Sequence, residues 1–192
     1  MAKKTGILIT VGVGYCVLDY DIVNAIKPII INGLVSLNLQ ANVLLNYQPT
    51  KQGITESTVY FHNIGDKDIG FVGRHATYNQ DQDNLIYKES QITETTFQVN
   101  TILKQDVENL TITAKDLCNY VKMILQSTET INKLKSSGLE TLRVTNIINT
   151  PFTGGADNYQ YNPSFDVVIV HTQELEYNIN KIDKIDQKIN EV

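Results

Sequence analysis

The chain has 192 residues, a formal net charge of −5, and 42% hydrophobic against 19% charged residues. This length fits a single domain, and this balance excludes both a disordered polypeptide and an integral membrane protein. Acidic residues outnumber basic ones, and the only arginines are Arg74 and Arg143. This argues against a protein that binds nucleic-acid phosphates, because such a protein needs a surplus of Lys and Arg on one face. The cysteines, Cys16 and Cys118, lie in apolar surroundings far apart in sequence and are predicted to be buried free thiols.

The first residues, 1–18, are predicted to form a leader segment. Lys3 and Lys4 precede an uncharged run from residue 6 to residue 18, which superficially resembles a secretory signal. Polar and glycine residues dilute this run, and no small-x-small cleavage site follows it before Asp19, so a signal peptide is not expected. The run is also too short to span a bilayer.

A first helix is predicted to begin at Asp19 or Asp21, either of which can cap it, and to end near Leu39. Its apolar residues recur every three or four positions and form one broad face. Pro28 lies inside this pattern, so a kink or two abutting segments are expected there. A strand is predicted to follow at residues 42–47.

The middle of the chain is rich in strand signals. Thr, Val, Tyr and Phe in the segment Ser57–His62 are typical of a strand. A turn-like segment, Asn63–Asp68, and a weaker strand, Ile69–Tyr78, are predicted next. The polar loop Asn79–Asn84 then leads into a long, half-exposed strand at Leu85–Leu103.

A second helix is predicted to begin at Thr113, whose hydroxyl is a natural N-cap, with Asp116 three residues on completing a capping box. Apolar residues at three- and four-residue spacing follow as far as Leu125. A further short helix, Glu129–Ser137, is expected to end at Gly138 in the left-handed conformation.

Two strands, a polar loop and a tail are predicted for the remaining residues. Alternation over Leu142–Ile148 and the Val- and Ile-rich segment Phe165–His171 predict the strands, joined by the polar loop Asn149–Pro163. The segment Glu174–Val192 is interpreted as a strand edge followed by a short helix or a tail that folds on a partner. The whole chain, 1–192, is therefore predicted to be a single α+β domain: an antiparallel sheet or sandwich with helices packed against one face.

No residue pattern points to a catalytic, cofactor or metal site. A Gly-x-Gly pair follows the first apolar run, but the third glycine of a dinucleotide loop is missing. His62, His75 and His171 have no spacing typical of metal ligands. Cys118 falls beside the apolar stripe of its helix, which is the setting of an inert thiol. We therefore expect a protein that is not an enzyme and holds no cofactor or metal.

Protein–protein contact is a more natural interpretation of the polar residues. The chain has 10 tyrosines with abundant Asn and Gln, a composition found both at interfaces and in ordinary half-buried strands. Acidic loop residues are usually solvated charge, although they also suit the lining of a channel. The candidate interface residues are Arg74, Asp81, Asp83, Gly154, Gly155, Asp157, Tyr159 and Tyr161.

Five stretches in succession resemble the neck terminator family of tailed bacteriophages, whose members are also called gateway or head–tail joining proteins. They cover roughly residues 40 to 173. They are Gln52-Gly53-Ile54-Thr55 leading into Val59-Tyr60-Phe61; Val72-Gly73-Arg74; Glu94 to Asn100; Leu110 to Ser127; and Leu142-Arg143-Val144-Thr145 followed by Pro163 to Val168.

The resemblance implies a tail-terminator-like α+β fold and a structural role without catalysis. Family members form a ring, usually a hexamer, between the portal–collar complex and the tail tube. The expected function is to terminate the tube, join it to the collar and portal-adaptor proteins, and leave a channel through which genome DNA passes without sequence-specific binding. The expected location is the neck of the virion, after assembly in the host cytoplasm, with no membrane involved.

Two alternatives remain open. A tail-tube or other tail-completion subunit of similar fold would polymerise, whereas a terminator stops at one ring. A small enzyme or ligand-binding domain is a third class, for which the sequence offers no convergent polar site. The roles of residues 1–18 and 174–192 lie outside the resemblance, and partner contacts are one use for both.

Overall fold

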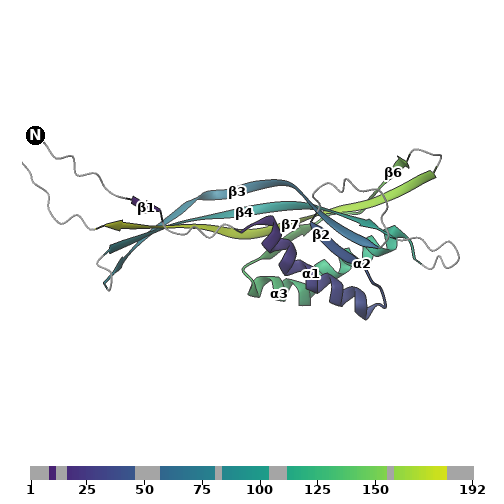
Figure 1. Cartoon of the computed structure of the whole chain (residues 1–192), viewed down its shortest axis with the longest axis horizontal. Coiled ribbons are helices and arrows are strands. Elements are labelled where there is room, and N and C mark those ends of the chain that lie inside the picture. The colour runs from purple at the N-terminus through teal and green to yellow at the C-terminus, as the bar shows by residue number, and fades with distance from the viewer. Residues whose placement is uncertain are drawn as a thin grey trace, which may run out of the picture. The chain divides into compact units, whose positions relative to one another are not determined.

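The computed structural model describes residues 9–11, 17–45, 57–80, 84–103, 112–154 and 158–180 (Figure 1). In these residues the strands form one sheet in the order β1-β7-β4-β3-β2, with β5 and β6 also paired to β7. The predicted α+β class is confirmed. In chain order the elements are β1 (Ile9–Val11), α1 (Asp19–Ser36), β2 (Asn42–Leu45), β3 (Thr58–Asn79), β4 (Asn84–Ile102), α2 (Ala114–Gln126), α3 (Thr128–Ser136), β5 (Glu140–Val144), β6 (Ile148–Gly154) and β7 (Asn158–Asn180).

The chain divides into two compact units. The first, which we call the helical unit, comprises Val17–Ile69 and Ile92–Thr172, and it contains α1, α2 and α3. The second, the strand unit, comprises Met1–Cys16, Gly70–Gln91 and Gln173–Val192, and its described elements are strands alone. The strands β3, β4 and β7 each contribute residues to both units.

In the helical unit the sheet is mixed, because β2 runs parallel to β3 while β5 and β6 run antiparallel to β7. The register of β6 runs from Ile148 opposite Ser164 to Gly154 opposite Asn158. The predicted polar loop Asn149–Pro163 is therefore wrong, since most of it is a β-hairpin. Thr, Phe and Tyr in this stretch favour an extended strand more than its Asn and Gly content favours a loop.

The helices cover one face of this sheet (Figure 1). Side chains alternate along each strand, so every second residue of β4 from Thr93 to Thr101 points toward the helices and is buried. Phe61 and Phe97 meet there edge to face, with ring centroids 6.1 Å apart and planes at 72°. The main apolar residues of this core are Ile22, Ile26, Ile30, Leu34, Phe61, Phe97, Val99, Leu117, Val121, Leu125, Phe165 and Ile169.

The N-terminus of α1 differs from the prediction. Leu18, rather than an aspartate, is the N-cap, and its backbone N–H donates to Asp21 Oδ2 at 3.1 Å. Asp21 thus caps the helix from its third position. The helix runs continuously past Pro28 instead of dividing into two segments, and it ends at Ser36, before the predicted Leu39. Asn38 adopts a left-handed φ of 56°, a conformation that helix-terminating Asn tolerates.

The two predicted caps further along the chain are confirmed. Thr113 Oγ1 accepts the Asp116 N–H at 3.2 Å, and Asp116 Oδ2 accepts the Thr113 N–H at 2.9 Å. Hydrogen bonds from the Thr113 side chain and backbone hold the pKa of Asp116 below its ordinary value. After α3, Gly138 has a φ of 75°, which glycine adopts without strain, and the helix stops.

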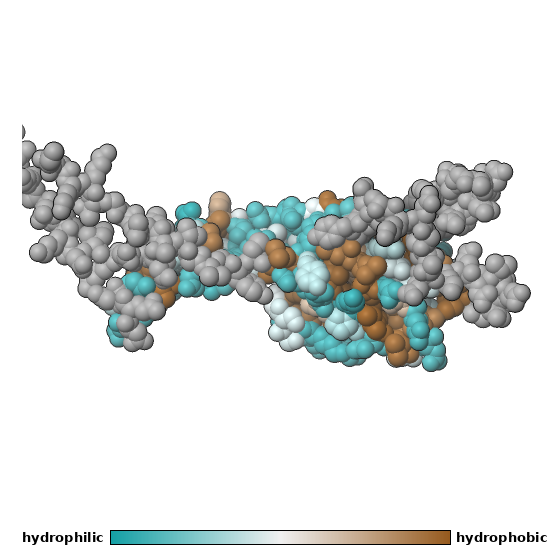
Figure 2. Space-filling model, viewed as in Figure 1, coloured by the Kyte–Doolittle hydropathy of each residue, from teal (hydrophilic) through white to brown (hydrophobic). Residues whose placement is uncertain are grey.

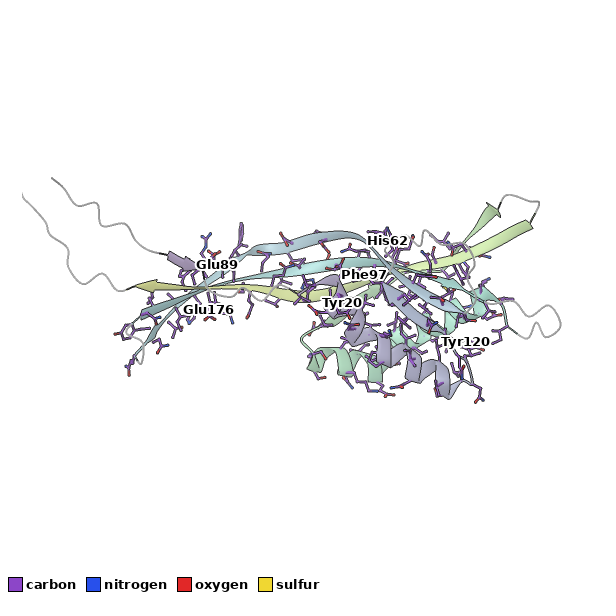
Figure 3. All side chains as sticks on the ribbon, in the orientation of Figure 1. Tyr20, His62, Glu89, Phe97, Tyr120 and Glu176 are labelled. Atoms are coloured by element: carbon purple, nitrogen blue, oxygen red, sulfur yellow. The ribbon has the colours of Figure 1, made fainter. Side chains whose placement is uncertain are left out.

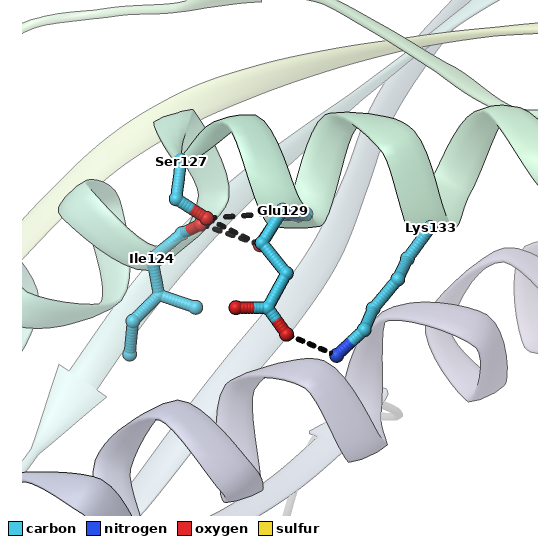
Figure 4. A network of polar contacts seen from close by, with 5 residues as sticks. Ile124, Ser127, Glu129 and Lys133 are labelled. Carbon is cyan, nitrogen blue, oxygen red and sulfur yellow. Dashed lines mark hydrogen bonds and ion pairs between the residues drawn. The ribbon is translucent and has the colours of Figure 1, made fainter.

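A sharp junction separates α2 from α3 (Figure 4). Ser127 ends α2 and caps α3, since its Oγ accepts the Thr130 N–H at 3.2 Å. The buried Thr130 hydroxyl donates to the Ile124 carbonyl at 2.6 Å. The Thr130 hydroxyl therefore satisfies a free carbonyl at the end of α2, and the Ser127 hydroxyl satisfies a free N–H at the start of α3.

The predicted turn at Asn63–Asp68 is also wrong, because β3 continues through it as a strand. The residues that predicted a turn nevertheless form a hydrogen bond typical of turns. Asn63 Oδ1 accepts the Gly65 N–H at 2.8 Å, as in an Asx turn, and its Nδ2 donates to Asp19 Oδ1 at 2.9 Å. A turn motif thus lies inside the strand and links it to the start of α1.

Close packing of α1 on α2 requires Gly33. A Cβ at this position would lie 2.7 Å from Ile124 Cδ1 and 2.8 Å from its Cγ1. Both atoms belong to a β-branched side chain with little rotamer freedom in a helix, so the neighbour does not yield easily. Gly33 is therefore needed for space rather than for backbone conformation.

Gly33→Leu is expected to lower the free energy of unfolding. Overpacking of a tight contact costs about 1–3 kcal/mol, which exceeds the gain of up to about 1 kcal/mol from replacing glycine in a helix. Urea denaturation followed by circular dichroism measures the change. Gly65→Ala is the matched control, because a Cβ there has open space and should leave stability nearly unchanged. Equal stability of the two variants would contradict the packing assignment.

Candidate assembly surfaces

A polar network on Glu89 holds three strands of the strand unit together. Glu89 Oε1 on β4 accepts from Arg74 Nε on β3 at 3.1 Å, and its Oε2 accepts from the Tyr177 hydroxyl on β7 at 3.0 Å. The Tyr177 ring stacks on Tyr87, with centroids 6.1 Å apart and planes at 26°. Burial, then the bond to Glu89, raises the pKa of Tyr177, so its hydroxyl stays protonated and donates. The Glu89 carboxylate thus connects β4 to both of its neighbours, β3 and β7.

The other face of the strand unit has its own charge pair. Lys88 alternates with Tyr87 and Glu89 along β4 and therefore points to the opposite side. Its Nζ lies 2.7 Å from Glu174 Oε2 on β7. This hydrogen bond raises the pKa of Lys88. Both faces of these strands therefore carry cross-strand polar contacts.

Phe71 on β3 is the most exposed apolar side chain in the strand unit. It is 100% exposed, and its neighbour Val72 is 43% exposed. Gly70 before it has a left-handed φ of 73°. A Cβ at Gly73 would lie 2.9 Å from Ser90 Oγ, which shows how closely β3 approaches β4 there. With Val72 beside it, Phe71 presents apolar area that is available for contact with a partner.

In the helical unit, the sheet face opposite the helices carries no Lys or Arg on residues 92–102 of β4 or 162–172 of β7. On β4 the half-buried residues of this face are Glu94, Thr96, Gln98 and Asn100. On β7 the corresponding residues between 162 and 172 are Asn162, Ser164, Asp166 and Thr172, with Val168 and Val170 among them. This surface offers hydroxyl, amide and carboxylate groups, which do not neutralise phosphates.

A second apolar surface lies on the helical unit, at the end of α1 and on β2 (Figure 2). Val35, Leu37 and Leu44 are each between 44% and 56% exposed there. Their side chains belong to neighbouring elements, because α1 packs against β2.

The structure places the candidate interface residues in different ways. Arg74 lies in the strand unit, with an exposed side chain paired to Glu89. Gly154, Tyr159 and Tyr161 come together in the β6–β7 hairpin, where Tyr159 is opposite Thr153 and Tyr161 opposite Pro151. The remaining candidates lie outside the described residues; they are Asp81, Asp83, Gly155 and Asp157.

Sequence reasoning missed Phe71, Glu89 and Tyr177. Glu89 and Tyr177 are 88 residues apart, and no local pattern reveals that their strands are neighbours. The available signal for Phe71 was its place between two glycines, Gly70 and Gly73, in the strand predicted at Ile69–Tyr78.

In the described part of the chain, no group of three His, Cys, Asp or Glu residues is arranged to hold a metal ion. Cys118 is a buried free thiol, as predicted, and burial raises its pKa to about 11. Cys16 lies outside the described residues. None of the described helices is long and apolar enough to cross a membrane.

His171 is a buried histidine in a partly polar setting. It is 3% exposed, and its Nε2 lies 2.9 Å from Thr95 Oγ1, while its Nδ1 has no hydrogen-bond partner among the described residues. Burial lowers its pKa, and the charges of Asp66 on β3 and Asp19 on α1 oppose this shift only in part. His171 is therefore neutral in the folded protein at pH 7.

His171 should make stability depend on pH below its ordinary pKa of 6.5. As pH falls through this value, the unfolded chain binds a proton before the folded one does, so the free energy of unfolding decreases. His171→Gln keeps a polar group near Thr95 but does not titrate. Urea unfolding between pH 7.5 and 5.5 should give a flatter profile for the variant, and parallel profiles would contradict the assignment.

Comparison with known families gives one match. A family model described as E217 gateway protein gp29 matches residues 21–181. The matched region includes α1 from its third residue onward, α2, α3 and every described strand except β1. No curated protein matches the chain.

Proposed function

The chain belongs to the phage gateway protein family, and from this premise we propose that it is a structural protein of the virion neck, without catalytic activity. It forms a ring, a hexamer by family resemblance, that terminates the tail tube and joins it to the portal–collar complex. The family match over residues 21–181 is the observation that carries this proposal. Its partners are other copies of the chain, the collar or portal-adaptor proteins and the tail-tube protein, and it assembles in the host cytoplasm.

The strand unit supports a role in assembly. Its residues are ordered by internal contacts around Glu89, yet Phe71 and Val72 remain exposed. A rigid surface loses little conformational freedom when a partner binds, so more of the contact energy contributes to affinity. These properties suit a subunit that builds a stable complex with neighbours.

The polar sheet face of the helical unit suits a channel wall. DNA binds tightly where Lys and Arg release its counterions, and each such contact adds to the affinity. Glu94 and Asp166 repel phosphates, while Thr96, Gln98 and Asn100 neither attract nor repel them strongly. We assign this face to the lumen, where the genome must pass without being held.

The oligomeric state tests the proposed function directly. Light scattering and negative-stain images of the same purified fraction, alone and after addition of tail tubes, should show closed rings with an axial hole or rings at tube ends. Long tubes formed by this protein alone would favour the tail-tube alternative. A monomer that stays monomeric with tubes and with the collar proteins would contradict the proposal.

Adding positive charge to the proposed lumen should create DNA binding. Thr96→Lys with Gln98→Lys is expected to give assemblies that retain duplex DNA at low salt and release it steeply as salt rises. Electrophoretic mobility shift at several salt concentrations measures this. The control pair, Gln126→Lys with Asn132→Lys, adds the same charge on exposed helix positions. Equal DNA retention by both pairs would contradict the lumen assignment.

A further inference from the structure

One face of the strand unit is rich in apolar and aromatic side chains. Glu89 accepts hydrogen bonds from Arg74 and Tyr177, so these three side chains lie together on one face. Tyr87 also belongs to it, because its ring stacks on that of Tyr177. We call this the tyrosine face. Alternation along the strands adds five more members, which are Val72, Ala76, Tyr78, Leu85 and Leu175.

The opposite face of the strand unit is polar. Lys88 and Glu174 pair there, and Glu176 shares this face because it is two residues from Glu174 along β7. Figure 3 labels Glu176, from the polar face, and Glu89, from the tyrosine face. The only full charges among the members of the tyrosine face, Arg74 and Glu89, balance each other. The strand unit is therefore an amphipathic sheet.

The tyrosine face has no covering layer among the described residues. The described elements of the strand unit are strands alone, whereas helices cover the sheet of the helical unit. On the tyrosine face, Val72 is 43% exposed and Leu175 is 37% exposed. An amphipathic sheet is stable when a second layer buries its apolar face. The composition of the strand unit thus calls for a layer that the described strands do not supply.

The segment 181–192 has the residue pattern of such a layer. It follows β7, which ends at Asn180 in the strand unit. Spacings of three, four and three residues separate its apolar positions, so they share one face of a helix and do not fit the alternation of a strand. Every other residue of the segment is charged or an amide. The apolar positions are Ile182, Ile185, Ile189 and Val192.

Asn180 and Asp183 mark a start for this helix. Their spacing is that of Thr113 and Asp116, which form the capping box of α2. Asn is among the preferred N-cap residues, and an N-cap has an extended backbone, so a strand can lead directly into a helix. As a helix, residues 182–192 are about 16 Å long, whereas residues 173–180 of β7 span roughly 26 Å. The tyrosine face is therefore long enough to hold the helix.

Attachment to β7 favours the tyrosine face of the same copy. A helix of this length is marginal in water by itself and needs a surface against which to fold. Because the segment begins where the strand unit ends, its effective concentration at that face is high. The matched family region ends at residue 181, so this helix is a feature of the present chain rather than of that region.

We propose that residues 181–192 fold as an amphipathic helix that docks on the tyrosine face of the same copy, with its four apolar residues turned toward the sheet. The contact supplies the missing layer and leaves the polar face, with the Lys88–Glu174 pair, open to partners. The inference goes beyond the proposed function and does not depend on ring formation.

A single introduced tryptophan tests the docking, because the chain contains no Trp. Ile185→Trp should emit at a shorter wavelength than the same variant unfolded in urea and should be shielded from iodide, since its ring lies between helix and sheet. Gln187→Trp is the matched control on the opposite side of the helix, and iodide should quench it as strongly as in urea. Equal quenching of the two folded variants would overturn the proposal.

Substitutions on the sheet test which face is covered. Added to Ile185→Trp, the pair Val72→Ser with Leu175→Ser removes apolar area from the tyrosine face and should increase iodide quenching. Phe71→Ser is the control on the polar face, to which Phe71 belongs because a Cβ at Gly73, two residues on, would lie 2.9 Å from Ser90 Oγ. It should leave quenching unchanged, and urea denaturation checks that each variant is folded. Equal quenching in both backgrounds would overturn the assignment.

Dilution separates docking within one copy from docking between copies. Shielding of the introduced tryptophan should persist at concentrations where light scattering shows monomers alone. Shielding that appears only on association would assign the helix to a neighbouring copy and overturn the proposal. Shielding in a protein that never forms rings would support this inference while contradicting the proposed function, so the two can fail separately.

Discussion

One-sided burial of the sheet in the helical unit is the constraint on which the rest depends. Three helices close one face, where Phe61 packs edge to face on Phe97. Because side chains alternate along a strand, each buried residue fixes the direction of its neighbours. The close approach of α1 and α2 at Gly33 lets the helices form one continuous cover. The core therefore decides which polar residues are presented on the opposite face.

This division separates two demands that a neck protein must meet. In the proposed role, the protein binds other proteins firmly and does not bind the DNA that passes by. In the strand unit, Arg74 and Tyr177 both donate to the Glu89 carboxylate, and the apolar side chains beside this network stay available for contacts. On the sheet face of the helical unit, the absence of Lys and Arg from residues 92–102 of β4 and 162–172 of β7 keeps counterion release, the main source of DNA affinity, small. Different residues serve the two demands, so neither compromises the other.

Local signals in the sequence predicted local structure well. Thr113 with Asp116 marked the start of α2, and Gly138 marked the end of α3, because caps depend on residues within one turn. The same reasoning failed at Asn63, whose Asx turn is real but lies inside a continuing strand. It also failed at Asn149–Pro163, where pairing between β6 and β7 outweighed a loop-like composition.

Of the candidate contact residues, the sequence marked Arg74 but not its partners. The network on Glu89 depends on strand neighbours far apart in the chain, and strand order is set by the whole sheet rather than by any short segment. Exposure is likewise a property of the fold. Phenylalanine is a residue type that is usually buried in a core. Only the fold shows that nothing in the described chain covers Phe71.

The pairing of β1 with β7 has a consequence for the order of synthesis. Ile9 is opposite Ile179, so the first described strand can find its partner only after nearly every other described residue has left the ribosome. Pairings of such long sequence separation form late, because their loop entropy must be overcome first. The strand unit is thus completed last, and a chain that ends before β7 lacks the strand with which β1 pairs.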